Sequence, residues 1–218
     1  MTGAGSRSAA EVRRLHAGEV THAADVLADA FDDDPVAAFI FRAGAPRARA
    51  LRRFFRIQLQ HLFLPHGEVW TVDAPSPSGS RRLAGVAMWS PADHRKATWR
   101  DALRLVPVLP AVARGPQPVD ALRLLAAVEE ARPRRPLWYL ATLGTAPELQ
   151  RQGYGSALLG PVLRRADEEG REAYLESSKE SNIAFYARHR FEVVGEVHAP
   201  GGGPTLWLML RPPRPPEG

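Results

Sequence analysis

The 218-residue sequence contains no cysteine, which excludes disulfide bonds, thiolate metal sites and cysteine nucleophiles. It also contains no uninterrupted apolar run near the roughly 20 residues that a bilayer-spanning helix needs. The first ten residues, MTGAGSRSAA, hold no apolar segment of signal-peptide length. We therefore expect a cytoplasmic protein without a membrane partner.

Lysine is scarce as well, because Lys96 and Lys179 are the only two, and almost all of the positive charge behind the formal net charge of +5 is arginine. A basic chain can bind nucleic acid or a phosphate-bearing cofactor. The arginines are scattered rather than clustered along one segment, which favours a compositional bias of the gene over a nucleic-acid partner. We expect no nucleic acid, and a nucleic-acid-binding protein with an RPPRPP tail remains the alternative.

Helical and strand spacings of apolar residues alternate along the chain, with no internal repeat. The pattern predicts an α/β protein in which one domain of about seven strands, with helices on both faces, spans residues 1–210. A helical insertion at 95–133 precedes the most apolar strand, and a disordered Pro- and Arg-rich tail is expected at 211–218. Predicted helices cover 21–31, 36–41, 46–63, 156–170 and 181–190, and predicted strands begin at 11 and cover 67–74, 81–91, 136–145, 173–177, 191–197 and 205–210.

The segment LQRQGYGSALL, residues 149–159, puts two glycines between the most apolar strand and a helix. A glycine turn at a helix N-terminus exposes backbone N–H groups that can hold an anion such as a phosphate, because no Cβ blocks the approach. The Walker loop is excluded, since Ser156 and Ala157 follow Gly155 where Lys and Ser or Thr are required. The dinucleotide loop is excluded by the bulky Leu158. An anion-binding loop and a structural helix cap both remain open.

A second segment, ESNIAFYARHRFEVVGEV, places Asn182 and Tyr186 four residues apart and therefore on one helix face. By itself the Tyr186 position favours a core aromatic residue with its hydroxyl hydrogen-bonded over a catalytic tyrosine.

Together the two segments resemble the GNAT superfamily of N-acetyltransferases. Its pyrophosphate loop has Arg or Gln, two residues, Gly, one residue, then Gly or Ala, and here Gln150 to Gly155 fit that pattern. The resemblance extends over essentially the whole chain and is closest to the puromycin N-acetyltransferase-like branch, through ADAFDDDP, GEVWTVDA, the strand–loop–helix segment and AYLESSKESNIAFYARHRFEV. Two positions depart from it: Arg190 replaces the usual Gly before Phe191, and Asp34 replaces an aromatic residue before Pro35.

The resemblance implies a mixed, mostly antiparallel seven-stranded sheet that splays at its central strands. It also implies acetyl-CoA as donor and direct transfer, in a ternary complex, to a primary amine of a small molecule. The backbone of Leu143 to Thr145 would pair with the pantetheine arm and the loop amides would hold the pyrophosphate. The implied cofactor-binding residues are Leu143, Gly144, Thr145, Gln150, Arg151, Gln152, Gly153, Tyr154, Gly155, Ser156 and Asn182.

Three catalytic roles follow from the resemblance. Tyr186 would act as general acid toward the CoA thiolate, and the N–H of Leu143 would polarise the thioester carbonyl. Glu176 would either deprotonate the acceptor amine or bind it as a cation, unless it is only a surface residue. The expected substrate-binding residues are Phe31, Asp33, Asp34 and Glu176, although Asp32 to Asp34 also fit a helix cap.

We expect no metal, because His61, His66 and His189 lack metal-ligand spacing. Two related functions remain alternatives: a protein or peptide N-acetyltransferase, and a CoA-binding module without turnover. The protein is expected to be a monomer or homodimer, and antibiotic resistance is one interpretation of its role.

Overall fold

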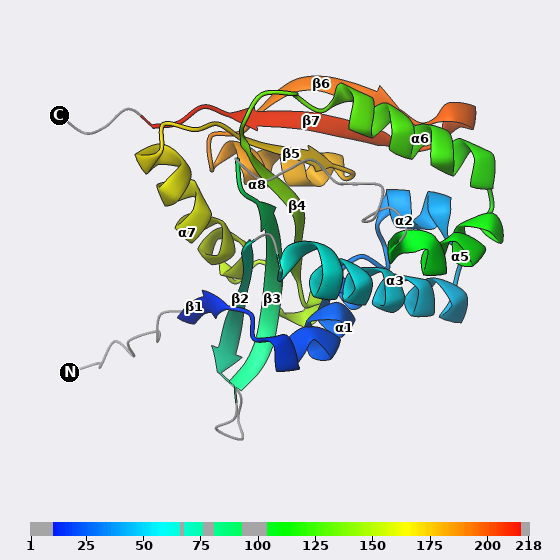
Figure 1. The fold of residues 1–218 in the computed structure, drawn as a ribbon, viewed down its shortest axis with the longest axis horizontal. Helices are drawn as coiled ribbons and strands as arrows, with labels where there is room; N and C mark the ends of the chain where they lie inside the picture. The colour runs from blue at the N-terminus through cyan, green and yellow to red at the C-terminus, as the bar shows by residue number, and fades with distance from the viewer. Residues whose placement is uncertain (1–10, 66–67, 76–80, 93–103, 215–218) are drawn as a thin grey trace, which may run out of the picture.

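The computed structural model describes residues 11–65, 68–75, 81–92 and 104–214, and its framework is a seven-stranded mixed sheet (Figure 1). The strand order is β1-β2-β3-β4-β5-β7-β6, and every neighbouring pair is antiparallel except β4 and β5. The strands are β1 (Glu11–Arg14), β2 (Glu68–Pro75), β3 (Arg81–Ser90), β4 (Trp138–Thr145), β5 (Ala173–Ser177), β6 (Glu192–His198) and β7 (Thr205–Arg211). The predicted mixed, mostly antiparallel sheet is confirmed.

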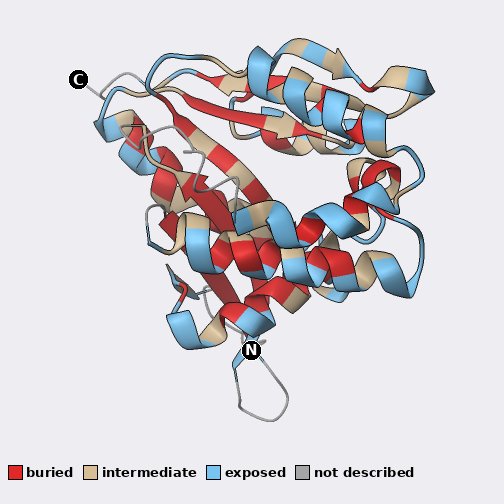
Figure 2. Cartoon of the chain, turned by 45° about the vertical axis from the view of Figure 1, so that its right-hand side comes forward, coloured by how far each residue is buried: buried red, intermediate tan, exposed pale blue. Residues whose placement is uncertain are grey.

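Helices cover both faces of this sheet because successive side chains of its central strands point to opposite sides. In β3, Val86 and Met88 belong to one core cluster and Ala87 and Trp89 to the other, and all four are fully buried. Figure 2 shows the buried residues concentrated along the central strands and the inner sides of the helices. The first cluster includes side chains of α1 (Val20–Ala30), α2 (Pro35–Ile40), α3 (Ala45–Ile57), α5 (Leu109–Ala113) and α6 (Pro118–Ala131), and the second those of α7 (Tyr154–Glu168) and α8 (Ile183–Ala187).

The helix predicted at 46–63 changes type partway along its length. α3 ends at Ile57, and a π-helix, Gln58–Phe63, continues it, as the hydrogen bond from Leu64 N to Leu59 O shows. Apolar periodicity cannot distinguish this wider helix from an α-helix over six residues, so the sequence did not reveal it.

The predicted helical insertion at 95–133 is present from residue 104 onward. It contains α5 and α6 with a break between Ala113 and Pro118, whereas residues 93–103 lie outside the described part. The helix predicted at 181–190 is shorter than expected, since a 3₁₀ turn at Glu180–Asn182 leads into α8.

The prediction of a disordered tail beginning at residue 211 is wrong at its start. Arg211 ends β7 opposite Ala173, and its side chain is buried. Both terminal guanidinium nitrogens donate to the Asp167 carboxylate, at 2.8 and 2.7 Å, and so satisfy the buried charge. The N–H of Arg214 also donates to Asp167. This ion pair fixes the chain as far as residue 214. Within the described ranges, no helix has the length and apolar character needed to cross a bilayer.

Candidate active site

The two parallel strands at the centre of the sheet separate soon after they meet. β4 and β5 pair only at Trp138, Tyr139 and Leu140, although β4 continues to Thr145. Near the point of separation β4 has a bulge, because Met88 of β3 pairs with Thr142 and Trp89 with Leu140, which leaves Ala141 without a partner. The second half of β4 therefore presents a free edge on the side of β5, as the splayed sheet predicted.

Backbone alternation determines which groups lie on this free edge. The N–H of Ala146 donates to Ala84 O at 2.8 Å, so residue 146 faces β3. Because successive residues of a strand face opposite neighbours, Gly144 also faces β3, and Leu143 and Thr145 direct their N–H and C=O groups away from it. Thr145 O accordingly accepts from the Gln150 side chain on the loop beyond. Leu143, predicted to contact the thioester, thus has its N–H on the free edge.

Gly144 has a packing reason to be glycine. A Cβ there would lie 2.7 Å from Leu27 Cδ2 and 3.2 Å from Ala30 Cβ, so only glycine lets α1 lie this close to β4. The backbone N–H and C=O groups of Gly144 face β3, and the strand continues through it to Thr145.

The loop between β4 and α7 exposes a series of unused backbone donors. In the described part of the chain, none of the N–H groups from Arg151 to Ser156 donates a hydrogen bond, and the first helical bond of α7 runs from Ala157 N to Gly153 O. Arg151 and Gly153 have φ values of 60° and 91°, in the left-handed region. Such a loop at the positive end of a helix dipole is suited to an anion.

Gly153 and Gly155 are required for different steric reasons. Nothing lies within 4 Å of a Cβ built on Gly153, so this position needs glycine for its positive φ. A Cβ on Gly155 would lie 3.2 Å from the Phe185 ring, so that position lets α8 pack against the start of α7. The amides of Gln150 and Gln152 bond back to Thr145 O and Glu148 O, both at 3.4 Å, and hold the loop.

Tyr186, the predicted general acid, is buried on α8 between Phe185 and Phe191, at ring centroid separations of 5.0 and 5.9 Å. Burial raises its pKa, so the phenol stays protonated at neutral pH. Its hydroxyl makes no hydrogen bond to a described residue and is not one of the fully buried polar atoms that lack a partner, so it is open to solvent or to a ligand.

The turn after α8 keeps its expected shape despite Arg190. This residue has φ 67°, and the N–H of Phe191 donates to Tyr186 O at 3.2 Å. Arginine thus adopts the left-handed conformation that the family's usual glycine would adopt more easily.

His189, which follows α8, lies close to the loop. Its Nε2 is 2.9 Å from Ser156 Oγ, and Phe185 packs edge-on to its ring. Burial, with the charges of Arg188 and Arg211, lowers the pKa of the imidazole, which is therefore neutral at pH 7. Asn182, also on this side, precedes α8, and its N–H donates to Lys179 O.

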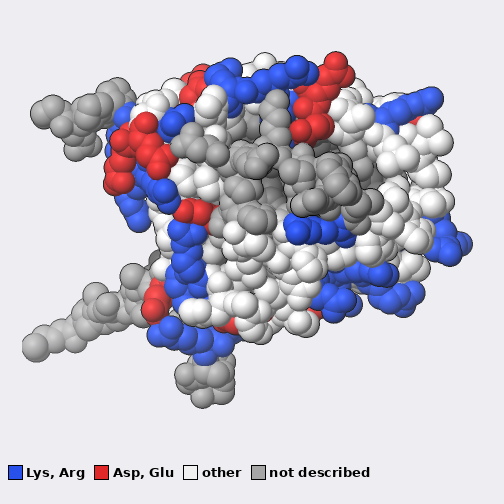
Figure 3. All heavy atoms as spheres, in the orientation of Figure 1, with Lys and Arg blue, Asp and Glu red and all other residues white. Residues whose placement is uncertain are grey.

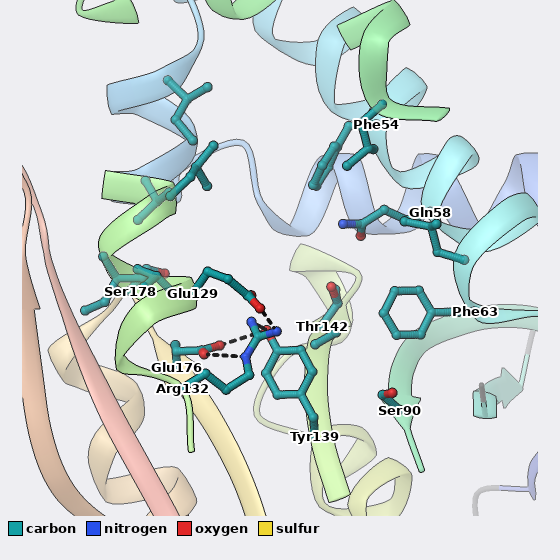
Figure 4. A pocket seen from close by; sticks show the side chains of 18 of the residues that line it. Phe54, Gln58, Phe63, Ser90, Glu129, Arg132, Tyr139, Thr142, Glu176 and Ser178 are labelled. Atoms are coloured by element: carbon teal, nitrogen blue, oxygen red, sulfur yellow. Dashed lines mark hydrogen bonds and ion pairs between the residues drawn. The ribbon is translucent and has the colours of Figure 1, made fainter. Parts of the chain in front are cut away.

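A cavity of about 1570 Å³ lies on the side of the sheet covered by α1, α3 and α6. Its described lining is mainly apolar and comes from the segment after α1, α2, α3, the π-helix, the insertion and the splayed strands. Thr142 of β4 and Glu176 of β5 line it, so it reaches the point where the two strands part (Figure 4). Five phenylalanines contribute rings to its wall: Phe31, Phe41, Phe54, Phe55 and Phe63.

Glu176 is buried at this junction and is not the surface residue that the sequence left open. Its side chain is only 7% exposed. Arg132 Nε donates to Oε1 at 3.3 Å and the Tyr139 hydroxyl donates to Oε2 at 2.8 Å. Arg132 also donates to the Tyr139 hydroxyl and lies over its ring, 3.9 Å from the centroid. Figure 4 shows this cluster at one end of the cavity.

The electrostatics of the cluster favour a proton-accepting carboxyl group. Burial raises the pKa of Glu176, and the Arg132 charge and the hydrogen bonds to the carboxylate offset only part of that effect. Burial also raises the pKa of Tyr139, so its phenol remains a donor to the carboxylate.

The acidic segment before α2 divides into separate roles. Asp34 is buried and caps α2, with Oδ1 accepting from Val36 N at 2.9 Å and Ala37 N at 3.0 Å, while Oδ2 accepts from the Ser178 hydroxyl. Asp33 is exposed and pairs with Lys179 at 2.6 Å. The helix-cap interpretation is therefore correct for Asp34, which also lines the cavity, as does Phe31.

The face of the molecule in Figure 3 has no continuous basic surface, because Lys and Arg are interspersed with Asp, Glu and uncharged residues. In the ranges that the structure describes, no group of three or more His, Cys, Asp or Glu residues could hold a metal ion.

Three residues at the cavity were missed by sequence reasoning: Arg132, Tyr139 and Gln58. Arg132 follows the last residue of α6, and Tyr139 reads as one more apolar residue of a buried strand. Gln58 lies on the apolar side of the predicted helix, four residues after Phe54, and a polar residue at such a position is a local signal. Arg132 and Tyr139 carry no local signal, since each acquires its environment only in the fold.

Comparison with known proteins agrees with this geometry. The model of the acetyltransferase (GNAT) family matches residues 46–191, more than half of the chain. Among solved structures, the histone acetyltransferase HPA2 and related acetyltransferase from Corynebacterium glutamicum aligns with a TM-score of 0.69 and 22% identity, over 96% of this chain and 99% of that one. Arylalkylamine N-acetyltransferase 2 from Aedes aegypti aligns with a TM-score of 0.60 and 11% identity, over 94% of this chain and 100% of that one. The polyamine N-acetyltransferase of Drosophila melanogaster aligns with a TM-score of 0.57 and 15% identity, over 93% of this chain and 99% of that one.

These structures share the fold, and the family match covers both the splayed strands and the glycine loop. The chain belongs to the acetyltransferase (GNAT) family and is an acetyl-CoA-dependent acetyltransferase.

Proposed function

We propose that this enzyme acetylates the primary amine of a small molecule with an apolar, preferably aromatic, body. The observation that carries the proposal is the large cavity, walled by five phenylalanines, that ends where β4 and β5 separate. Residues of α6 such as Leu122, Leu125 and Val128 line it, so the insertion forms part of its wall. A cavity walled by the insertion in this way suits a small acceptor better than an extended peptide.

The residues present fit acetyl-CoA. The free edge at Leu143 and Thr145 offers N–H and C=O groups to an extended amide-containing arm, as a sheet edge does to a peptide. The unused N–H groups from Arg151 to Ser156 suit a pyrophosphate, and the Arg151 side chain has no partner in the described part of the chain. When bound, acetyl-CoA supplies the activated acetyl group.

Each proposed catalytic group acts on a different atom. The N–H of Leu143 stabilises negative charge on the thioester oxygen, and Glu176 accepts the proton that the amine loses. Tyr186 donates its phenolic hydrogen toward the departing sulfur. Asn182, on the same side of α8, is proposed to contact the CoA arm, and no acetyl group is transferred to the protein in this scheme.

Of the two roles open to Glu176, proton acceptance is the better supported. The position that a substrate cation would take beside the carboxylate is filled by the Arg132 guanidinium, which also covers the Tyr139 ring. A raised pKa makes the carboxylate a stronger base, and Asp33, being exposed and paired with Lys179, is poorly placed for this role.

The carboxylates of the lining also argue for a monoamine acceptor. Of the four carboxylates in the lining, Asp34 is hydrogen-bonded to the start of α2 and to Ser178, and Glu129 and Glu176 pair with Arg132. Only Glu130 is left, among the described lining residues, to meet a second ammonium group. The structural neighbours include enzymes named for arylalkylamines and for polyamines, and the cavity favours the former type. Membership of the puromycin N-acetyltransferase-like branch remains a prediction from the sequence.

A direct test compares acceptors. The purified enzyme with acetyl-CoA should acetylate 2-phenylethylamine and tryptamine with kcat/KM about 10-fold or more above that for agmatine, 1,4-diaminobutane or an N-terminal alanine peptide. Tyr186→Phe should lower kcat by about 10²-fold and leave the Kd of acetyl-CoA unchanged, because it removes one proton donor without changing the packing.

Two results would contradict the proposal. A peptide acceptor that outperforms every amine would favour the protein acetyltransferase alternative. Tight acetyl-CoA binding without turnover on any amine or peptide would favour the non-catalytic module.

A further inference from the structure

Gln58 is a polar residue in the apolar wall of the cavity that the proposed mechanism does not use. It is the first residue of the π-helix and lies one turn after Phe54, so the two side chains share a helix face. Figure 4 shows its amide extending into the cavity between the rings of Phe54 and Phe63.

The amide is poorly satisfied by the protein. Its Oε1 is buried and has no hydrogen-bond partner among the described residues. Buried carbonyl oxygens of this kind are nearly always bonded, because an unsatisfied acceptor destabilises the fold. An aliphatic side chain would fill the same space without that cost. A π-helix turn is also a less stable local structure, and such turns are frequent at functional sites.

The position of Gln58 indicates which part of a substrate it meets. In Figure 4 the amide and the Thr142 hydroxyl face the same part of the cavity, and the Thr142 side chain makes no hydrogen bond to a described residue. Thr142 directly precedes Leu143, where the thioester carbonyl is proposed to lie. An acceptor amine has to reach that carbonyl, so its N–H groups pass between Gln58 and Thr142.

We propose that Gln58 is the residue that binds the amino group of the acceptor, with its amide oxygen accepting an N–H as the nitrogen approaches the thioester. A half turn of the terminal amide, a torsion with a broad energy profile, directs the oxygen to the ligand. This inference rests on the proposed function, and it assigns the unsatisfied amide to substrate binding.

The test replaces Gln58 with Leu, and uses Gln60→Leu as matched control because Gln60 is exposed on the same π-helix. With 2-phenylethylamine, we expect Gln58→Leu to raise KM about 10-fold, with the Kd of acetyl-CoA unchanged and Tm equal to or above that of the wild type. Calorimetric titration of the amine into the CoA-saturated protein should show the same loss of affinity. Gln60→Leu should change neither KM nor amine affinity.

The outcomes separate the two proposals. A lower Tm with unchanged KM would show that Gln58 is structural, and unchanged KM and Tm would show that it does not bind the amine. Either result overturns this inference and leaves the acetyltransferase proposal standing. If no amine is bound or acetylated by the wild-type protein, both proposals fail.

Discussion

The Arg132 guanidinium is bonded to the Glu176 carboxylate, with Nε 3.3 Å from Oε1, although 44 residues separate the two in sequence. Arg132 stands at the end of the helical insertion and Glu176 at the point where β5 leaves β4. The contact therefore connects the wall of the acceptor cavity to the proposed proton acceptor. Glu129 shares the same guanidinium, with a distance of 2.9 Å to Nη1, but its side chain is 70% exposed.

This contact predicts a change in pH dependence. Glu176 accepts a proton only when it is ionised, so kcat/KM falls as the pH drops through its pKa. Burial raises that pKa and the Arg132 charge opposes the rise, so Arg132→Met should raise it further. We expect the acidic limb of the kcat/KM profile to move to higher pH in Arg132→Met, and Glu176→Gln to lower kcat by about 10²-fold.

The matched control is Arg123→Met, which removes an equal charge from the exposed face of α6, where Arg123 pairs with Asp120. Deprotonation of the amine adds the same pH dependence to the profile of every variant. The informative quantity is therefore the difference between the profiles of two variants measured with the same substrate. Coincident profiles for the Arg132→Met and wild-type enzymes would exclude Glu176 as the group that sets the acidic limb.

Local patterns predicted those parts of the fold whose causes are local. β4 follows from its nearly continuous apolar run, which is typical of a strand covered on both faces, and the glycine loop follows from its position between strand and helix. The Arg132–Glu176 contact and the orientation of Gln58 depend on packing between distant segments. No pattern of neighbouring residues encodes them.

The loop offers a test in which two glycines are compared. Gly153 in the loop and Gly170 after α7 have φ values of 91° and 63°, and neither has any atom within 4 Å of a Cβ. Replacement by Ala should therefore impose a similar backbone strain, about 1 kcal/mol, at both positions. Only Gly153 directs N–H groups at the proposed pyrophosphate site. Gly153→Ala should weaken acetyl-CoA binding by about 10-fold, and Gly170→Ala should not.

Calorimetric titration with acetyl-CoA and thermal melting of both variants check this prediction together. Equal losses of stability with a selective loss of affinity at Gly153 would support the loop assignment. Equal affinities in the two variants would show that the left-handed conformation at Gly153 serves only to begin α7.

Arg190 predicts a gain of stability from a single substitution. Its φ of 67° is unfavourable for a residue with a Cβ, and the turn it forms lets Phe191 N donate to Tyr186 O. Arg190→Gly should remove the strain, and the gain is reduced by the greater freedom of glycine in the unfolded chain. The expected net stabilisation is about 0.5 to 1 kcal/mol, a rise in Tm of about 1 to 4 °C for a chain of this size.

The control is Arg188→Gly, two residues earlier, where φ is −61° and arginine is unstrained. Glycine there should lower the stability, because it gains nothing from a positive φ and costs conformational entropy. Opposite signs for the two substitutions would show that the conformation at 190 causes the gain, because loss of the favourable charge interaction between Arg190 and Asp167 can only destabilise the protein. Loss of stability in both variants would mean that the Arg190 side chain contributes more than its backbone strain costs. Since Tyr186 lies in the same turn, kcat of Arg190→Gly would also report whether the turn's rigidity matters to the proposed acid.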